Sequence, residues 1–220
     1  MKQSVIITAG GIGKRMKSDL PKQYISVQGL PVLMHTINKF YAYDAEMQIV
    51  ISLPKDFIQM WKDLCEKHEF NIPHEITEGG IERYHSIKNA LQKVKGEIVM
   101  VHDAVRPLVS IQTISNVTEK AKSKGAAIPV LPIKDTLRKG DSENSQHQDR
   151  SEFWIVQTPQ AFKLDLLQEA YQIPYSSAVT DDASLVEAMG KQVFLTEGNE
   201  ENIKITTPFD LKLVEFLLEK

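Results

Sequence analysis

The chain has 220 residues, of which 42% are hydrophobic, so it can bury a sizeable core and has the length of a single domain. Its formal net charge of -3 lacks a basic excess, and we therefore expect neither nucleic acid nor a membrane as its partner. Cys65 is the single cysteine, which excludes an intrachain disulfide and favours a reducing, cytoplasmic compartment.

Short apolar runs alternate with longer segments of helical spacing along the chain. The apolar runs stop at turns, which is typical of buried parallel strands. We expect strands at Val5 to Thr8, Ile49 to Leu53 and Ile98 to His102, and helices at Leu33 to Tyr41, Phe57 to His68 and Ser86 to Val94. This alternation predicts an α/β fold with a mostly parallel sheet flanked by helices.

Two helix starts can be predicted from capping residues. Ser110 is suited to cap a helix from Ile111 to Lys122. Thr207, Pro208 and Asp210 provide a cap, a proline at the first helical position and an acid at the third. We expect the helix that follows to close the core at the C-terminus.

A polar segment from Lys139 to Glu152 contains no large apolar residue, although strand-like sequence flanks it at Ile128 to Leu137 and Phe153 to Val156. A polar stretch of this length inside a compact domain is either disordered or functional. We interpret it as the tip of a projecting hairpin. One domain over residues 1–220 would then carry a β-arm insertion at about 133–158.

The first predicted strand leads into the loop Ala9-Gly10-Gly11-Ile12-Gly13-Lys14-Arg15. Glycines let backbone N–H groups approach an anion closely, and the two cations add positive charge. A plain strand-to-helix turn is the alternative. Three glycines followed by two cations favour phosphate binding.

Two familiar phosphate loops do not match this one. A dinucleotide fingerprint would require a third glycine where Met16 stands and an acid at the end of the second strand, where Ser52-Leu53-Pro54 stands. A Walker A loop would require Ser or Thr in place of Arg15. The loop is therefore expected to bind phosphate in another fold.

Two further lysines stand where a phosphate could be met. Lys22 follows Pro21, which restricts the backbone, and could reach a triphosphate as a point charge; a solvated surface lysine is the alternative. Lys204 lies in the strand-like run Asn202 to Thr206. A cation between β-branched neighbours requires an anionic partner if it is buried.

Asp103 follows the third predicted strand, at the edge where open α/β sheets bind ligands. Its carboxylate could hold Mg²⁺ or a ribose hydroxyl, whereas the structural alternative is an Asp that caps a turn. His102 is expected to pack rather than to ligate metal, since no second His or Cys stands at ligand spacing.

Two more segments admit both a structural and a binding interpretation. Gly79 and Gly80 precede a helix that contains Ser86, and such glycines suit recognition of a base or phosphate by backbone groups, or a plain helix entry. The run Thr180-Asp181-Asp182-Ala183-Ser184 has the form of a helix cap followed by acids in the first turn.

In this order the segments resemble the 2-C-methyl-D-erythritol 4-phosphate cytidylyltransferase family over nearly the whole chain. The motifs that carry the resemblance are AGGIGKRM, PKQY, GGIERYHS, HDAVRP, KDT, QTPQ, TDDAS and NIKIT. The resemblance implies a Rossmann-like nucleotidyltransferase fold, a homodimer joined through a β-arm, CTP and a sugar phosphate as substrates, and a divalent cation such as Mg²⁺.

The resemblance also implies roles for individual residues. Arg15, Lys22 and Lys204 would be catalytic and stabilise the reacting phosphates. Asp103 would bind the metal and the ribose. The CTP pocket would include Ala9, Gly10, Gly11, Gly13, Gly80, Ser86 and Asp103, and the sugar phosphate would be held by Arg106, Thr136, Arg150, Thr158 and Thr180.

Three alternatives stay open at the level of sequence. The Gly10-Gly11 pair also resembles pentitol-phosphate cytidylyltransferases, whereas Tyr24 and the NIKIT segment resemble the methylerythritol enzymes. From other classes, an NAD-dependent oxidoreductase lacks support in the glycine loop, and a non-catalytic nucleotide-binding regulator would not need Lys22, Asp103 and Lys204 together.

Overall fold

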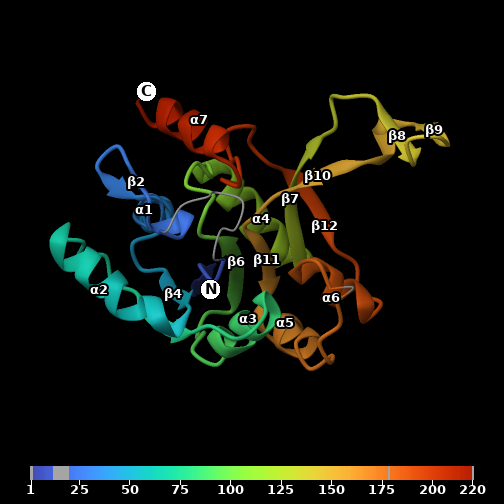
Figure 1. Ribbon diagram of the computed structural model, residues 1–220. Coiled ribbons are helices and arrows are strands. Elements are labelled where there is room, and N and C mark those ends of the chain that lie inside the picture. The colour runs from blue at the N-terminus through green and yellow to red at the C-terminus, as the bar shows by residue number, and fades with distance from the viewer. Residues whose placement is uncertain (1, 12–19, 178, 220) are drawn as a thin grey trace.

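The computed structural model of the chain describes residues 2–11, 20–177 and 179–219 (Figure 1). Its central feature is an eight-stranded sheet. Along the sheet, seven strands follow the hydrogen-bonded order β10 (Trp154–Val156), β7 (Ala126–Pro132), β11 (Gln160–Lys163), β6 (Ile98–Asp103), β1 (Gln3–Thr8), β4 (Gln48–Leu53) and β5 (Glu75–Glu78). The eighth, β12 (Phe194–Glu197), pairs with β7.

Strand directions agree with the predicted fold class. β1 lies parallel to both β4 and β6, β4 is parallel to β5, and β7 is parallel to β12. The exception is the returning strand formed by β10 and β11, which runs antiparallel to β7, and β11 is also antiparallel to β6. The mostly parallel sheet and the three predicted strands are therefore confirmed.

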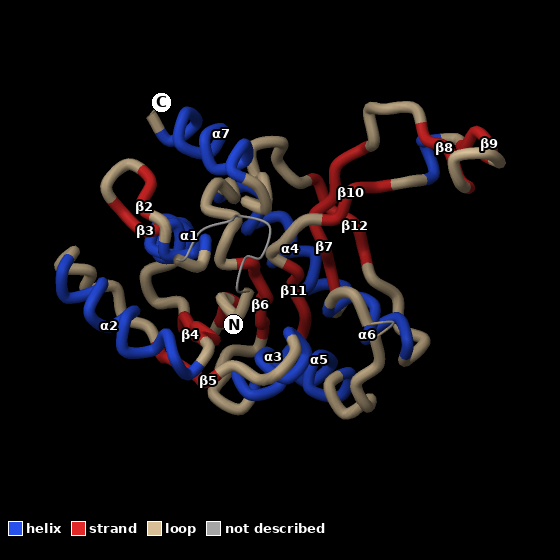
Figure 2. Tube along the Cα trace, in the orientation of Figure 1, coloured by secondary structure: helices blue, strands red, loops and turns tan. Residues whose placement is uncertain are grey.

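Alternation along the buried strands gives the sheet two apolar faces. Val5 and Ile7 contribute to one core cluster, whereas Ile6 between them belongs to the other. The first face is covered by α1 (Val32–Tyr43), α2 (Ile58–Lys67) and α4 (Ile111–Lys124), and the second by α3 (Arg83–Leu91), α5 (Leu164–Ala170) and α6 (Asp182–Ala188). Helices thus flank the sheet on both sides, as Figure 2 shows.

The last helix, α7 (Pro208–Leu218), begins at the predicted capping box of Thr207 and Asp210. Its buried Val214 packs with Ile205 and Val105 in a separate, smaller cluster. The helix therefore closes a core cluster, as expected, but this cluster is separate from those on the two faces of the sheet. The position of the helix buries Ile205, the residue that follows Lys204.

Short elements complete the described chain. A two-stranded ribbon is formed by β2 and β3, and three 3₁₀ helices interrupt the loops. Their bounds are β2 (Ser26–Val27), β3 (Leu30–Pro31), η2 (Lys22–Tyr24), η3 (Lys55–Phe57) and η4 (Arg150–Glu152). The run from Asn202 to Thr206, predicted to be strand-like, forms no strand, because its backbone bonds to a neighbouring loop instead of a sheet edge.

The predicted arm projects from the sheet between β7 and β10. Its hairpin pairs β8 (Leu137–Gly140) with β9 (Ser145–Gln148) in a sheet of its own, and Figure 1 shows it extending away from the domain. The carboxylate of Asp141 accepts hydrogen bonds from the backbone N–H groups of Glu143 and Asn144, which closes the tip.

Ser110 provides a test of how local sequence fixes α4. Its Oγ accepts a hydrogen bond of 3.0 Å from the backbone N–H of Thr113, as the cap prediction requires. We expect Ser110→Ala to lower the free energy of unfolding by about 1 kcal/mol in urea titrations, because this N–H loses its partner. Ser123→Ala, in the last turn of the same helix, is the matched control and should change it by less than about 0.5 kcal/mol. Equal effects would contradict the capping role.

Candidate active site

A cavity of about 550 Å³ lies where the carboxyl ends of β1, β4 and β6 meet. Parallel strands bring their following loops to the same edge of the sheet, so segments far apart in sequence share this cavity. Among the residues predicted for the site, those that line it are Ala9, Gly10, Gly11, Lys22, Gly80, Ser86, Asp103 and Lys204. Gly13 and Arg15 lie outside the described residues.

Two glycine segments form one wall. The N–H of Gly79 donates to the carbonyl of Leu53 at 2.7 Å, and the N–H of Gly80 donates to Ser86 Oγ at 3.0 Å. A Cβ on Gly10 would lie 3.8 Å from the same Ser86 oxygen. The segment after β1 and the segment before α3 therefore approach each other at Ser86, with backbone rather than side chains at the surface.

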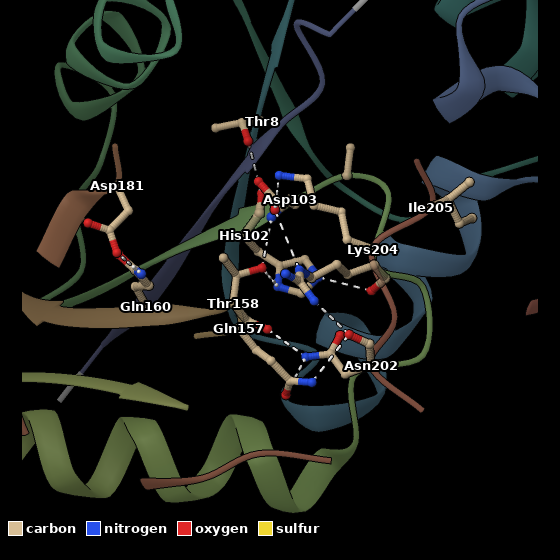
Figure 3. Close-up of polar contacts among 12 residues, drawn as sticks. Thr8, His102, Asp103, Gln157, Thr158, Gln160, Asp181, Asn202, Lys204 and Ile205 are labelled. Carbon is tan, nitrogen blue, oxygen red and sulfur yellow. Dashed lines mark hydrogen bonds and ion pairs between the residues drawn. The ribbon is translucent and has the colours of Figure 1, made fainter. Parts of the chain in front are cut away.

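The floor of the cavity carries Asp103, which is 8% exposed. Its Oδ2 lies 2.9 Å from Lys204 Nζ and 3.5 Å from Arg106 Nε (Figure 3). Burial by itself would raise the pKa of Asp103, but Lys204, Arg83 and Arg106 outweigh it and hold this pKa well below its usual range. Asp103 is therefore a carboxylate at neutral pH, and it is an anionic partner for Lys204, although Lys204 is exposed rather than buried.

Lys22 reaches the same end of the cavity from η2. Its Nζ donates to the carbonyl of Ile205 at 2.7 Å, directly beside Lys204 in the chain. The neighbouring Gln23 is buried and donates to the carbonyl of Ala9 at 2.7 Å, which ties η2 to the end of β1. Two lysines separated by more than 180 residues are thus held at one side of the cavity.

Arg83 lines the cavity but was missed in the sequence. Its Nη2 lies 2.6 Å from Asp182 Oδ2, and Asp182 is fully buried and also accepts a 2.5 Å hydrogen bond from the hydroxyl of Tyr171. Burial lowers the pKa of Arg83, but Asp182 and Asp103 outweigh it and raise this pKa above its usual value. The sequence offered a signal for this ion pair, since Arg83 lies in the motif GGIERYHS and Asp182 lies in the motif TDDAS.

The run Thr180 to Ser184 has the structural role expected of it, and the binding role stays a prediction. Asp181 caps α6 in a capping box with Ser184, as predicted, and its carboxylate also accepts from Gln160 Nε2 at 2.7 Å. Asp182, interpreted as a first-turn acid, is in addition the buried counter-ion of Arg83. Thr180 itself is exposed and does not line the cavity.

Besides Thr180, four other residues predicted to bind the sugar phosphate do not line the cavity. Two of them lie behind Asp103 and two lie on the arm. Arg106 is held behind Asp103, with its Nη1 donating to the carbonyl of Asn202 at 2.7 Å. Thr158 is buried below Asp103. Thr136 and Arg150 lie on the exposed arm, where Arg150 Nη1 donates to the carbonyl of Lys134.

His102 packs inside the protein, as expected. Its ring is fully buried, meets Phe40 edge-to-face at 4.9 Å between centroids, and bonds to the carbonyl of Arg106 at 3.0 Å. Burial lowers the pKa of His102 to about 4, so the imidazole is neutral at physiological pH. It is a structural neighbour of Asp103 rather than a group exposed to the cavity.

The described residues contain no cluster of three or more His, Cys, Asp or Glu side chains placed to hold a metal ion. Asp103 and Glu82 are the acids that line the cavity. Within the same described ranges, no helix is long and apolar enough to cross a membrane.

Gly80 tests how tightly the glycine wall is built. An added Cβ would lie 2.3 Å from His85 Cβ, whereas at Gly11 it would meet nothing among the described atoms within 4 Å. We expect Gly80→Ala to lower the free energy of unfolding by about 1 to 3 kcal/mol through overpacking. Gly11→Ala is the matched control and should change the thermal midpoint little. A Gly80 variant as stable as the wild type would show that this wall can adjust.

Comparison with known proteins agrees with this arrangement. The profile of the 2-C-methyl-D-erythritol 4-phosphate cytidylyltransferase family matches residues 3–220. The enzyme of this name from Phocaeicola vulgatus is 52% identical over 219 residues, covering 99% of this chain and all of the relative. The one from Bacillus licheniformis is 39% identical, covering all of this chain and 96% of the relative.

Solved structures give the same result. The Thermus thermophilus enzyme of this name has a TM-score of 0.82 at 33% identity, with both chains fully covered. The 4-diphosphocytidyl-2C-methyl-D-erythritol synthase from Anaerococcus prevotii has a TM-score of 0.85 at 29% identity, covering all of this chain and 96% of the other. The chain therefore belongs to the 2-C-methyl-D-erythritol 4-phosphate cytidylyltransferase family and is a nucleotidyltransferase.

Proposed function

We propose that the protein transfers CMP from CTP to 2-C-methyl-D-erythritol 4-phosphate, giving 4-diphosphocytidyl-2-C-methyl-D-erythritol and pyrophosphate. The observation that carries this proposal is the shape of the cavity, which has a wall of glycine backbone at one side and Lys22 and Lys204 at the other. A nucleotide has the matching polarity, with a flat base at one end and a highly charged triphosphate at the other.

The glycine wall is suited to the nucleoside. Gly10, Gly11 and Gly80 line the cavity without side chains, so a planar base can approach their peptide groups closely. Ser86 fixes the wall through its bond to Gly80, and Asp103 stands at the floor where a ribose would lie.

The proposed reaction needs positively charged side chains and does not need a general base. The phosphate of the acceptor is already an anionic nucleophile, so it can attack the α-phosphorus of CTP in line while pyrophosphate departs. Lys22 and Lys204 would stabilise the charge that develops on the transferring and departing groups. Arg15, outside the described residues, is proposed to act with them.

A magnesium ion fits this site as part of the nucleotide complex. Mg²⁺ is usually held by one or two carboxylates together with substrate phosphates and water, so Asp103 is sufficient as a protein ligand. The low pKa of Asp103 keeps this ligand ionised. When bound, the ion would neutralise triphosphate charge and orient it, while Lys204 and Arg106 would balance Asp103 from the protein side.

We propose a homodimer in the cytoplasm, and the apolar surface of the arm favours the dimer. The segment Phe153 to Val156 presents four consecutive large apolar side chains that are each 40% to 50% exposed in the single chain. Such a patch is typical of a protein interface. The arm extends away from the domain (Figure 1), and its residues Thr136 and Arg150 do not line the cavity of their own subunit. We therefore propose that they contact the sugar phosphate in the partner subunit. Thr180 and Arg106 are proposed to hold the acceptor within the same subunit.

The lysine assignment can be tested by pyrophosphate release from CTP, Mg²⁺ and methylerythritol 4-phosphate. We expect Lys22→Ala and Lys204→Ala each to lower kcat by about a hundredfold or more, because each removes charge that the transition state needs. Lys212→Ala, an exposed lysine on α7, is the control and should leave kcat unchanged.

The same assay decides the acceptor. Ribitol 5-phosphate and ribulose 5-phosphate replace methylerythritol 4-phosphate in parallel reactions. We expect methylerythritol 4-phosphate to give the highest kcat/KM of the three acceptors. Faster turnover of ribitol 5-phosphate would favour the pentitol-phosphate alternative indicated by Gly10-Gly11.

Arg150 tests the dimer. A charge-assisted contact contributes roughly 1.5 to 3 kcal/mol, so Arg150→Ala should raise KM for the sugar phosphate about ten- to hundredfold and that for CTP much less. Mixing Arg150→Ala with Lys22→Ala subunits should restore activity, because a heterodimer contains one site with both residues intact. Light scattering must show a dimer. Exchange of subunits between the two variants must be confirmed separately. An exchanged mixture that stays inactive would place Arg150 outside the partner's site.

A further inference from the structure

The returning strand of the arm enters the sheet directly behind the Asp103–Lys204 ion pair. Gln157 and Thr158 lie between β10 and β11 and are 3% and 7% exposed. Figure 3 shows that both side chains take part in a chain of polar contacts with His102 and Asn202. Neither Gln157 nor Thr158 lines the cavity, so what they do for the reaction must pass through other residues.

The hydroxyl of Thr158 links His102 to Asp103. His102 Nε2 lies 3.0 Å from the carbonyl of Arg106, and a carbonyl only accepts, so Nε2 carries the hydrogen. The other nitrogen, Nδ1, is then an acceptor and receives the hydroxyl hydrogen of Thr158 at 3.1 Å. The Thr158 oxygen in turn accepts from the backbone N–H of Asp103 at 3.1 Å. Each group has its partner, which fixes the backbone that carries the Asp103 carboxylate.

The amide of Gln157 anchors the segment that carries Lys204. Its Oε1 accepts from Asn202 Nδ2 at 3.3 Å, and the same Nδ2 donates to the carbonyl of Thr158 at 2.8 Å. Asn202 is fully buried and stands two residues before Lys204. On the other side of Lys204, the N–H of Ile205 donates to the carbonyl of Val105 at 3.0 Å. The backbone around Lys204 is thus fixed at both ends.

We propose that Gln157, Thr158, His102 and Asn202 form a positioning junction, through which the root of the arm sets the geometry of the Asp103–Lys204 pair. The proposal rests on the proposed function of that pair. It assigns Thr158 a role behind the site, in place of the direct contact with the sugar phosphate that the resemblance implies. It also makes the arm root a part of the active-site scaffold, in addition to the role of the arm tip.

The physical reason is that an ion pair acts on a reaction only if its charges are correctly placed. The Lys204 side chain is 44% exposed and flexible, so its direction depends on a fixed backbone and a fixed carboxylate. The Lys204 backbone and the Asp103 carboxylate both depend on Gln157 and Thr158, two consecutive residues of the returning strand. This strand therefore controls both partners of the ion pair.

Thr158→Val and Thr158→Ser test the junction in the full-length protein. Valine has nearly the same shape but leaves His102 Nδ1 and the Asp103 N–H unpaired, whereas serine keeps the hydroxyl. We expect valine to lower kcat about tenfold or more, with both KM values within about threefold of wild type. Serine should restore kcat to within about threefold. A rise in KM for the sugar phosphate with kcat unchanged would overturn the proposal, since it would indicate direct contact.

A double-mutant cycle separates positioning from general destabilisation. If Thr158 acts through the pair, Thr158→Val should change kcat by less than about threefold in a Lys204→Gln background, measured with radiolabelled CTP. The same tenfold loss in both backgrounds would overturn the proposal. Absence of pyrophosphate release by the wild-type protein with every acceptor would instead refute the proposed function, so the two failures are distinguishable.

Asn202→Ala keeps the test decisive if the valine variant does not fold. This change removes the anchor of the Lys204 segment and also a buried Oδ1 that has no hydrogen-bond partner among the described residues, so its cost to stability is partly offset. We expect a folded protein with kcat lowered about tenfold. Asn116→Ala, which breaks an exposed pair with Gln112, is the control. A folded Asn202→Ala protein with wild-type kcat would overturn the proposal.

Discussion

The buried carboxylate of Asp103 is the group on which the rest of the site depends. A charge at the end of a buried strand is unfavourable unless cations and hydrogen bonds compensate it, and here Lys204 and Arg106 provide the charges. This need brings two parts of the chain together, because Arg106 lies in the loop that directly follows β6, whereas Lys204 approaches from the segment before α7. The site is therefore assembled by compensation of one charge.

A second buried charge organises the opposite wall in the same way. Asp182 lies inside the protein under Arg83 and Tyr171, and this pair joins the start of α3 to the start of α6. Since α3 also carries Ser86 and follows the glycine segment, the glycine wall of the cavity is fixed by contacts behind it. Each of the two pairs thus joins a buried or nearly buried acid to a cation that keeps some contact with solvent, half-buried in Arg83 and exposed in Lys204.

The arm combines a polar tip with an apolar strand, β10, and the surroundings of each part account for its composition. Its tip is solvated and pairs only with itself, whereas β10 exposes consecutive apolar side chains that a lone subunit leaves in water. The root of the arm differs from both, since Gln157 and Thr158 are buried, with Thr158 bonded to the backbone of Asp103 and Gln157 bonded to Asn202. One insertion therefore has a solvated tip, an exposed apolar middle and a buried base.

The sequence by itself determined local features. The three apolar strands of the sheet centre, the caps at Ser110 and Thr207 and the polar arm depend on neighbours close in the chain, and the structure agrees with each. Tertiary structure decided the rest. That the run around Lys204 is no strand, that Thr158 lies behind Asp103, and that Arg83 pairs with Asp182 depend on contacts between residues far apart in the chain. Periodicity and capping carry no information about such contacts, because burial of a charge selects its partner only when the whole chain has folded.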